Sequence, residues 1–264
     1  MARCRCTSAL DANLFEAYTA KGLDGVPADL QLDQEHRVTP IDHGDVCINY
    51  DKAYFASHNL AVPNSLEDLT KPAYKGLLVT ENPATSSPGL AFLLATIQHF
   101  GDPGYLGYWK ILRQNEVQVV DGWETAYYTN FSGSSGKGPQ PLVVSYGTSP
   151  AAEVMFSKTP LSDSPIGSVL GPDTCFRQIE FAGVLKGTKQ KALAQQFIDF
   201  MLSKDFQADM PGQMFVFPVL PDVPLPEEFT KYAQQPAQPA TLPPDAIAKN
   251  REAWIQAWTE AVLK

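Results

Sequence analysis

Residues 76–101, GLLVTENPATSSPGLAFLLATIQHFG, carry the pattern that decides the fold. Residues 76–80 form a short apolar run, a polar turn follows, and residues 90–100 form an amphipathic run that Gly101 closes. Residues 116–129 and 141–156 repeat this order of apolar run, polar turn and helical run. Three such units predict an α/β fold with a mainly parallel sheet.

The segments around these units predict further helices and strands. We expect strands at residues 45–50 and 178–185, and helices at residues 10–21, 66–69 and 244–263. The first of these helices would end at Gly22. The last has an apolar face that must dock on another element; its residues are Ile247, Trp254, Ile255, Trp258 and Val262.

A helix opening at Thr188 places Leu193, Phe197 and Met201 on one stripe. His99, late in the helix over residues 90–100, is expected to face solvent. Residues 211–244 are Pro-rich and predict an extended strap, and residues 132–138, SGSSGKG, predict a flexible loop.

Length and composition narrow the class of protein. The chain has 264 residues, 44% of them hydrophobic, enough for one large or two modest domains. The net charge of -9 without a Lys/Arg cluster argues against a nucleic-acid or anionic-membrane partner. No stretch approaches the ~20 apolar residues of a membrane span.

The sequence contains four cysteines, Cys4, Cys6, Cys47 and Cys175, and their spacing is not that of a metal site. We therefore expect unpaired thiols and no metal. We also expect no cofactor.

Two turns place hydroxyl side chains at the start of a helix, TSSPG at residues 85–89 and GTSP at residues 147–150. In each, Ser87 or Ser149 would be the N-cap and the following proline the first helical residue. Such turns lie at the carboxyl edge of a parallel sheet, where free N–H groups and the helix dipole favour anions. The alternative is that both turns are simple helix starts.

Two aromatic residues fall on the same predicted edge. Trp123 follows the second strand, and Tyr146 lies in the turn after the third. A flat or cationic ligand could stack on these rings, although aromatic residues at strand ends are more often part of the core.

Enzyme motifs are missing from the sequence, including the nucleophile elbow, the Walker loop and the dinucleotide-binding and zincin signatures. The four histidines lie outside the predicted turns. Glu81, Asp121 and Glu124 near the turns could form an acid/base pair, but binding without catalysis is the better interpretation.

In these residues and their order, the chain resembles the thiamine-binding periplasmic proteins of ABC importers. These belong to the wider iron- and polyamine-type class of binding proteins. The resemblance runs from about residue 9 to the C-terminus. Its segments are residues 10–14, 50–52, 83–90 (PATSSPGL), 122–123, 145–151 (SYGTSPA), 178–182, 194–200 and 251–258 (REAWIQAW).

The resemblance implies a type II periplasmic-binding-protein fold, with two lobes, hinge strands and a ligand held in the cleft between the lobes. It assigns Ser86 and Ser87 to the hydroxyl or phosphate end of the ligand and Trp123 to stacking on a ring. The remaining implied ligand-binding residues are Tyr146, Gly147, Thr148, Ser149 and Phe215.

The sequence departs from the family at three points. Ala152 stands where the family has an aromatic residue, and Phe215 where it has a tryptophan. The family also begins with a signal peptide and about eighty further residues that form one wall of the cleft. We therefore expect an N-terminally truncated chain with an incomplete first lobe. Residues 1–44 would be its remnant, residues 45–180 the second lobe, and residues 181–264 a return crossover, strap and C-terminal helix.

The function implied is that of a monomeric solute-binding component that delivers thiamine or thiamine phosphates to a membrane permease. Another small solute, such as a polyamine or an iron chelate, is the alternative, although the chain lacks the paired tyrosines of iron sites. A thiamine-degrading enzyme of similar fold, with Cys47 or Cys175 as nucleophile, is a third. The resemblance implies a periplasmic or membrane-associated location, although MARCRC at the N-terminus is not followed by the apolar segment of a signal peptide.

Overall fold

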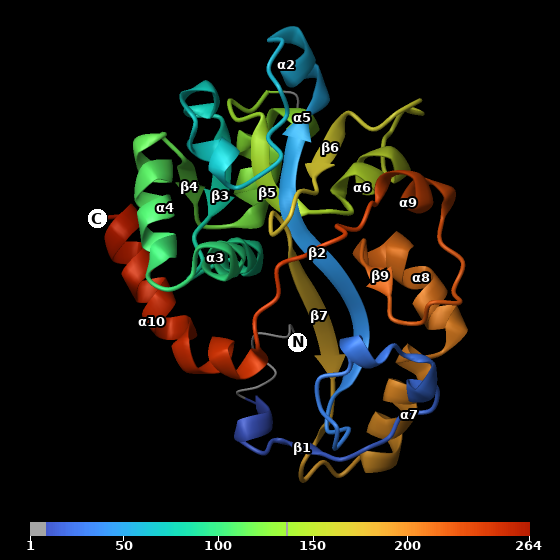
Figure 1. The fold of residues 1–264 in the computed structure, drawn as a ribbon. Helices are drawn as coiled ribbons and strands as arrows, with labels where there is room; N and C mark the ends of the chain where they lie inside the picture. Colours follow the sequence, from blue (N-terminus) through green and yellow to red (C-terminus); the bar gives the residue numbers. More distant parts are fainter. Residues whose placement is uncertain (1–8, 136) are drawn as a thin grey trace. The chain divides into compact units, whose positions relative to one another are not determined.

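The computed structural model describes residues 9–135 and 137–264 and divides the chain into two units. The first contains the described part of residues 1–44 with residues 178–227 and 243–249, and the second contains residues 45–177, 228–242 and 250–264. Two strands, β2 (Thr39–Asp51) and β7 (Phe176–Ala182), belong partly to each unit (Figure 1). The units are therefore connected by continuous strands as well as by loops.

The main sheet is mixed. Its strands lie in the order β4 (Gln118–Val120), β3 (Leu78–Glu81), β5 (Leu142–Tyr146), β2 and β6 (Ile166–Val169), and β7 and β9 (Phe217–Pro218) also pair with β2. Strand β3 is parallel to both β4 and β5. The three predicted strand–turn–helix units are confirmed, but the prediction of a mainly parallel sheet is wrong. The sheet is mixed because β2 pairs antiparallel with β5, β6 and β9.

Each parallel strand leads into a helix. Strand β3 leads into α3 (Ser87–Phe100), which Gly101 ends with a φ of 71°. Strand β4 leads into η5 (Thr125–Asn130), which is a π-helix, and β5 leads into α6 (Ser149–Met155). The expected flexible loop at residues 132–138 contains the short helix α5 (Ser132–Ser135), and residue 136 lies outside the described residues.

The predicted C-terminal helix is confirmed as α10 (Pro244–Val262), which lies beside α4 (Gly104–Gln114) (Figure 1). Trp258 is fully buried, with its ring centroid 5.3 Å from that of Trp109. Trp254 Nε1 donates a hydrogen bond of 2.9 Å to Asp102. The expected apolar face is buried except for Ile255, which is half-buried. No helix in the described residues is long and apolar enough to cross a membrane.

Because Trp258 has no exposed surface, truncating it leaves a cavity against Trp109. We expect Trp258→Ala to lower the free energy of unfolding by about 3–5 kcal/mol, measured by urea denaturation. Gln256→Ala, on the exposed side of the same helix, is the control and is expected to change it by less than about 0.5 kcal/mol. Equal effects of the two substitutions would contradict this packing.

The helix predicted over residues 10–21 is wrong. Within residues 9–21, only residues 9–11 are helical. Phe15–Glu16 forms strand β1, which pairs with β8 (Val184–Leu185). Phe15 is buried in the core of the first unit, together with Leu23 of η1 (Leu23–Gly25) and Leu30 of η2 (Ala28–Leu30). Pairing with a distant strand overrides the local pattern here.

Two predictions for residues 188–244 need correction. Helix α7 (Lys191–Met201) begins three residues after the expected start at Thr188. Leu193 and Phe197 of the expected stripe are 61% and 56% exposed, whereas Met201 is half-buried and packs with buried Ile198 on the core of the first unit. The Pro-rich region is only partly extended. Helix α8 (Lys204–Met214) continues through Pro211, and α9 (Glu227–Tyr232) follows β9.

The prediction that His99 faces solvent is also wrong. Its two ring nitrogens lie 2.7 Å from a carboxylate oxygen of Glu67 and 3.0 Å from one of Asp173. Glu67 begins η3 (Glu67–Thr70), which is a 3₁₀-helix where a helix over residues 66–69 was expected; η4 (Pro72–Tyr74) follows it. Burial opposes the charged form of His99, but the two carboxylates outweigh burial and raise its pKa.

A raised pKa in the folded state means that the His99 contribution to stability is complete below the ordinary pKa of histidine and is lost as pH rises through the folded value. We therefore expect His99→Gln to reduce the free energy of unfolding more at pH 5.5 than at pH 8.5. Chemical denaturation of both proteins at the two pH values measures this difference. A loss that is equal at both values would contradict the ion-pair assignment.

Candidate functional site

Three turns meet at one edge of the second unit. They follow β3, β4 and β5, and these three neighbouring strands are parallel. Carboxyl ends of parallel strands lie at the same edge of a sheet, where α/β proteins usually bind their ligands. The candidate site is this edge, formed by residues 82–87, 121–124 and 146–149.

Side-chain hydrogen bonds connect the three turns. Thr85 Oγ1 in the first turn donates a 2.7 Å hydrogen bond to the carbonyl oxygen of Asp121 in the second. Trp123 Nε1 in the second turn donates a 2.8 Å hydrogen bond to Ser145 Oγ, at the end of β5. Ser145 Oγ lies 3.1 Å from Ser149 Oγ at the start of α6. These contacts bring the predicted residues of all three turns together.

The Trp123 ring belongs to an aromatic cluster. It stacks on Tyr127 of η5 with ring centroids 4.9 Å apart, and its centroid is 6.3 Å from that of Tyr146. Tyr127 is buried and donates a 2.8 Å hydrogen bond to Glu153 of α6. Burial and the Glu153 carboxylate raise the pKa of Tyr127 well above its usual value, so its hydroxyl stays protonated. Tyr127 therefore supports one face of Trp123, and the Trp123 side chain is half-buried.

The N-cap predictions are wrong by one residue. Ser86, not Ser87, is the N-cap of α3 and accepts from the Gly89 N–H at 3.4 Å. Thr148, not Ser149, is the N-cap of α6, and its hydroxyl has no partner among the described residues. Proline then stands at the second helical position, where its missing N–H is also tolerated because first-turn N–H groups have no intrahelical acceptor.

Burial separates the predicted ligand-binding residues into two groups. Ser87 is exposed, and Trp123 and Tyr146 are half-buried. Ser86, Gly147, Thr148 and Ser149 are buried. Phe215 lies in the first unit, where it ends α8 with a φ of 58°. The structure thus brings seven of the eight predicted residues to one edge, and Phe215 belongs to the other unit.

Side chains from β2 and β6 hold the backbone of the third turn, and the sequence did not reveal them. Asn49 Nδ2 donates to the carbonyl oxygen of Tyr146 at 3.2 Å and to Ser168 Oγ at 2.9 Å. The Gly147 N–H donates to the carbonyl oxygen of Asp45 at 2.8 Å. A buried asparagine inside an apolar strand is the signal that could have indicated this role, since buried amides are normally hydrogen-bonded.

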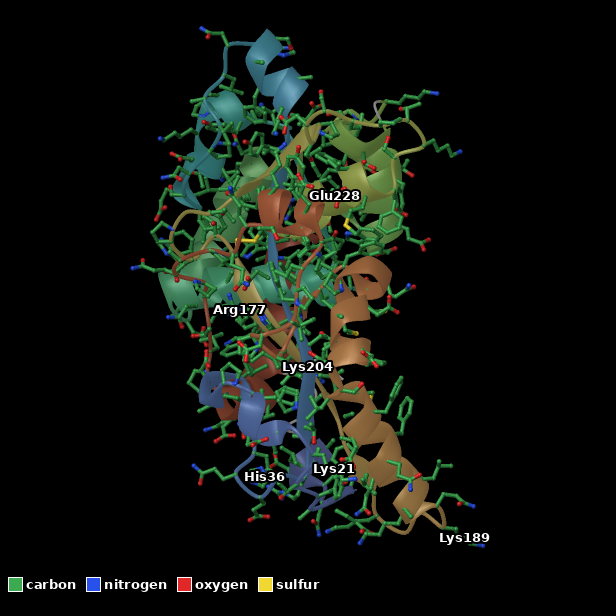
Figure 2. The ribbon with its side chains drawn as sticks, turned by 90° about the vertical axis from the view of Figure 1, so that its right-hand side faces the viewer. Lys21, His36, Arg177, Lys189, Lys204 and Glu228 are labelled. Carbon is green, nitrogen blue, oxygen red and sulfur yellow. A yellow bond between two sulfur atoms is a disulfide. The ribbon has the colours of Figure 1, made fainter. Side chains whose placement is uncertain are left out.

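The prediction of unpaired thiols is wrong for Cys47 and Cys175, which form a disulfide (the bond between two yellow atoms in Figure 2). Sequence spacing cannot reveal a pairing across 128 residues. A Cβ on Gly147 would lie 3.2 Å from Cys47 Sγ, so the disulfide packs directly beneath the third turn. Arg177, labelled in Figure 2, makes two hydrogen bonds of 2.6 and 3.0 Å to buried Asp45. Cys4 and Cys6 lie outside the described residues.

Closing a loop of 128 residues restricts the unfolded chain, which corresponds to about 5 kcal/mol in the chain-entropy model. We expect dithiothreitol to lower the urea midpoint of the wild-type protein markedly. The double variant Cys47→Ser/Cys175→Ser should unfold at the lower midpoint with or without the reductant. A wild-type midpoint unaffected by reduction would contradict the disulfide.

The arrangement defines a class of protein. Two α/β units share continuous strands, and one sheet edge presents hydroxyl groups, a helix start and a supported tryptophan ring. No group of three or more metal-ligating side chains occurs in the part of the chain that the structure describes. These features are those of a binding protein with the type II periplasmic fold.

Comparison with known proteins gives the family. Residues 6–250 match the family model described as bacterial extracellular solute-binding protein, and the chain belongs to this family. It is 33% identical to the thiamine-binding periplasmic protein of Escherichia coli, over 97% of this chain and 75% of that protein. It is 32% identical to the protein of the same name from Brucella suis, over 97% of this chain and 74% of that protein.

Solved structures agree with this assignment. A periplasmic thiamin binding protein superposes with a TM-score of 0.83 at 29% identity, covering 99% of this chain and 77% of that chain. The ferric ion-binding protein A of Pasteurella haemolytica superposes with a TM-score of 0.79 at 17% identity, covering 98% of this chain and 80% of that chain. The second similarity shows the fold alone.

Proposed function

We propose that this chain is the solute-binding component of an ABC importer and that its ligand is thiamine or a thiamine phosphate. The names of its relatives support this ligand. The observation that carries the proposal within the chain is the Trp123 ring, which Tyr127 stacks against and the hydrogen bond to Ser145 orients. A planar cationic ring is a suitable partner for such a surface.

In this proposal the predicted residues have two roles. Ser87 and Trp123 meet the ligand, Ser87 at the hydroxyl or phosphate end and Trp123 at a ring, and Tyr146 adds a second aromatic contact. Ser86 sets the start of α3, whose N-terminus favours an anion. The buried Gly147, Thr148 and Ser149 shape the turn. Phe215 is proposed as a further ligand-binding residue, and residues 45–180 as the second lobe.

The proposed role is transport rather than catalysis. The thiamine-degrading alternative needs a free cysteine nucleophile, whereas Cys47 and Cys175 are joined in a disulfide. Disulfides are typical of oxidising compartments, which supports a periplasmic location. The partner is an ABC permease, as in the relatives' class of protein, and the receptor is proposed to act as a monomer without a nucleic-acid partner.

Isothermal titration and thermal unfolding test this proposal directly. Thiamine at one hundred times its dissociation constant should stabilise the wild-type protein by about 2.7 kcal/mol. Trp123→Ala should weaken binding roughly tenfold or more, because a desolvated cation–π contact contributes about 2 kcal/mol.

Tyr54→Ala removes a half-buried aromatic ring on α2 (Lys52–Ser57) and serves as the matched control. It should bind thiamine like the wild type. The proposal fails if spermidine or ferric citrate stabilises the protein and thiamine does not, or if Trp123→Ala binds thiamine as tightly as the control.

A further inference from the structure

Glu81, the last residue of β3, carries a carboxyl group that no contact so far explains. The residue has no exposed surface. Neither of its carboxylate oxygens has a hydrogen-bond partner among the described residues. Buried carboxyl groups are normally paired or hydrogen-bonded because removing their charge from water is costly. An unpaired one at a ligand-binding edge therefore requires a reason.

The register of the sheet places Glu81 beside the Trp123 contact. Val79 pairs with Val143 in β5, so Glu81, two residues later, is level with Ser145, the acceptor of the Trp123 hydrogen bond. On its other side Glu81 pairs with Val120 at the end of β4. Neighbouring strands are about 4.8 Å apart, so Glu81 lies between the strand ends that hold Trp123.

The alternation of side chains along β3 places Glu81 on the same face of the sheet as Trp123. Val79 packs in a cluster with Tyr127 and Val143, and Trp123 lies against this cluster. Glu81 follows Val79 by two residues and therefore points to the same face. Its carboxyl group consequently lies at the side of the sheet that the aromatic cluster covers.

The elements around Glu81 provide no positive charge. The turn after β4, η5, β5 and α6 contain no Lys, Arg or His, and His99 of α3 lies in the last turn, far from the edge. The titratable groups on these elements are Asp121, Glu124, Tyr127, Tyr128, Tyr146 and Glu153. Without a counter-charge, burial raises the pKa of Glu81 to about 8, so the carboxyl group is mainly protonated at neutral pH.

We propose that Glu81 is a specificity-determining residue that supplies the counter-charge for a cationic ring stacked on Trp123. This inference rests on the proposed function, which makes Trp123 the stacking surface. A neutral ring of the same shape would gain the stacking contact but would not interact favourably with an ionised Glu81. The site therefore selects for charge as well as for shape.

The proposal links binding to proton release. A cation favours the ionised form of Glu81, lowers the pKa of its carboxyl group and displaces its proton. Affinity for the cation is therefore present in full above the pKa of the unliganded state and is lost as pH falls below it. If only the ionised form accepts the cation, affinity changes about tenfold per pH unit below that pKa.

Isothermal titration with thiamine at pH 6, 7 and 8, in buffers of different ionisation enthalpy, measures both effects. The thiazolium ring of thiamine carries a permanent positive charge, and an analogue with an uncharged ring of the same shape is the comparison ligand. The wild-type protein should bind thiamine at least tenfold more tightly at pH 8 than at pH 6 and release close to one proton at pH 7. Binding of the neutral analogue should not change with pH.

Two variants separate charge from structure. Glu81→Gln keeps the shape of the side chain, and it should bind thiamine about tenfold more weakly than the wild type at pH 8, without pH dependence, while binding the neutral analogue unchanged. Glu260→Gln removes an exposed carboxylate on α10, outside the candidate site, and should retain the wild-type pH dependence.

Wild-type binding of thiamine that is tight and equal at pH 6 and pH 8, without proton release, would overturn the inference and leave the proposed function intact. No binding of thiamine at any pH would overturn both. Equal losses of thiamine and neutral-analogue binding in Glu81→Gln would also overturn it. The wild-type proton count decides the matter if Glu81→Gln does not fold.

Discussion

The parallel pairing of β3 with both β4 and β5 is the constraint on which the candidate site depends. It brings three strand ends to one edge, and each end then contributes a different group. The first contributes a helix start with hydroxyls, the second a tryptophan, and the third the serines that position that tryptophan. Without this pairing, the hydrogen bonds of Thr85 and Trp123 would have no acceptors within reach.

Strand β2, which lies next to this parallel group, holds the third turn of the edge in place. Antiparallel β2 supplies Asn49 and the Asp45 carbonyl group to the backbone of the third turn, and Cys47 joins it covalently to Cys175. These groups are buried, so they fix the turn rather than meet a ligand. Gly147, Thr148 and Ser149 are buried as well, so we propose that they shape the third turn of the candidate site rather than contact a ligand.

Much of this arrangement was predictable from local patterns. The three strand–turn–helix units, the convergence of Ser86, Trp123 and Tyr146, and the amphipathic C-terminal helix follow from periodicity, turn chemistry and strand order. The predictions that failed concern residues whose structure depends on partners distant in the sequence. Phe15 forms a strand because of residues 184–185, His99 is held by Glu67 and Asp173, and Cys47 pairs across 128 residues. Local sequence carries no information about such partners. The sequence also could not show that the carboxyl group of Glu81 is buried without a partner, because burial and strand register depend on the folded structure.

The central claim is that Trp123 is the surface on which a cationic ring stacks. A crystal structure of the protein grown with thiamine tests it most directly. The account predicts that the centroid of the thiazolium or pyrimidine ring lies within about 6 Å of the Trp123 ring centroid, over the face that Tyr127 leaves free. A thiamine molecule bound elsewhere on the protein, with no contact to Trp123, would contradict it.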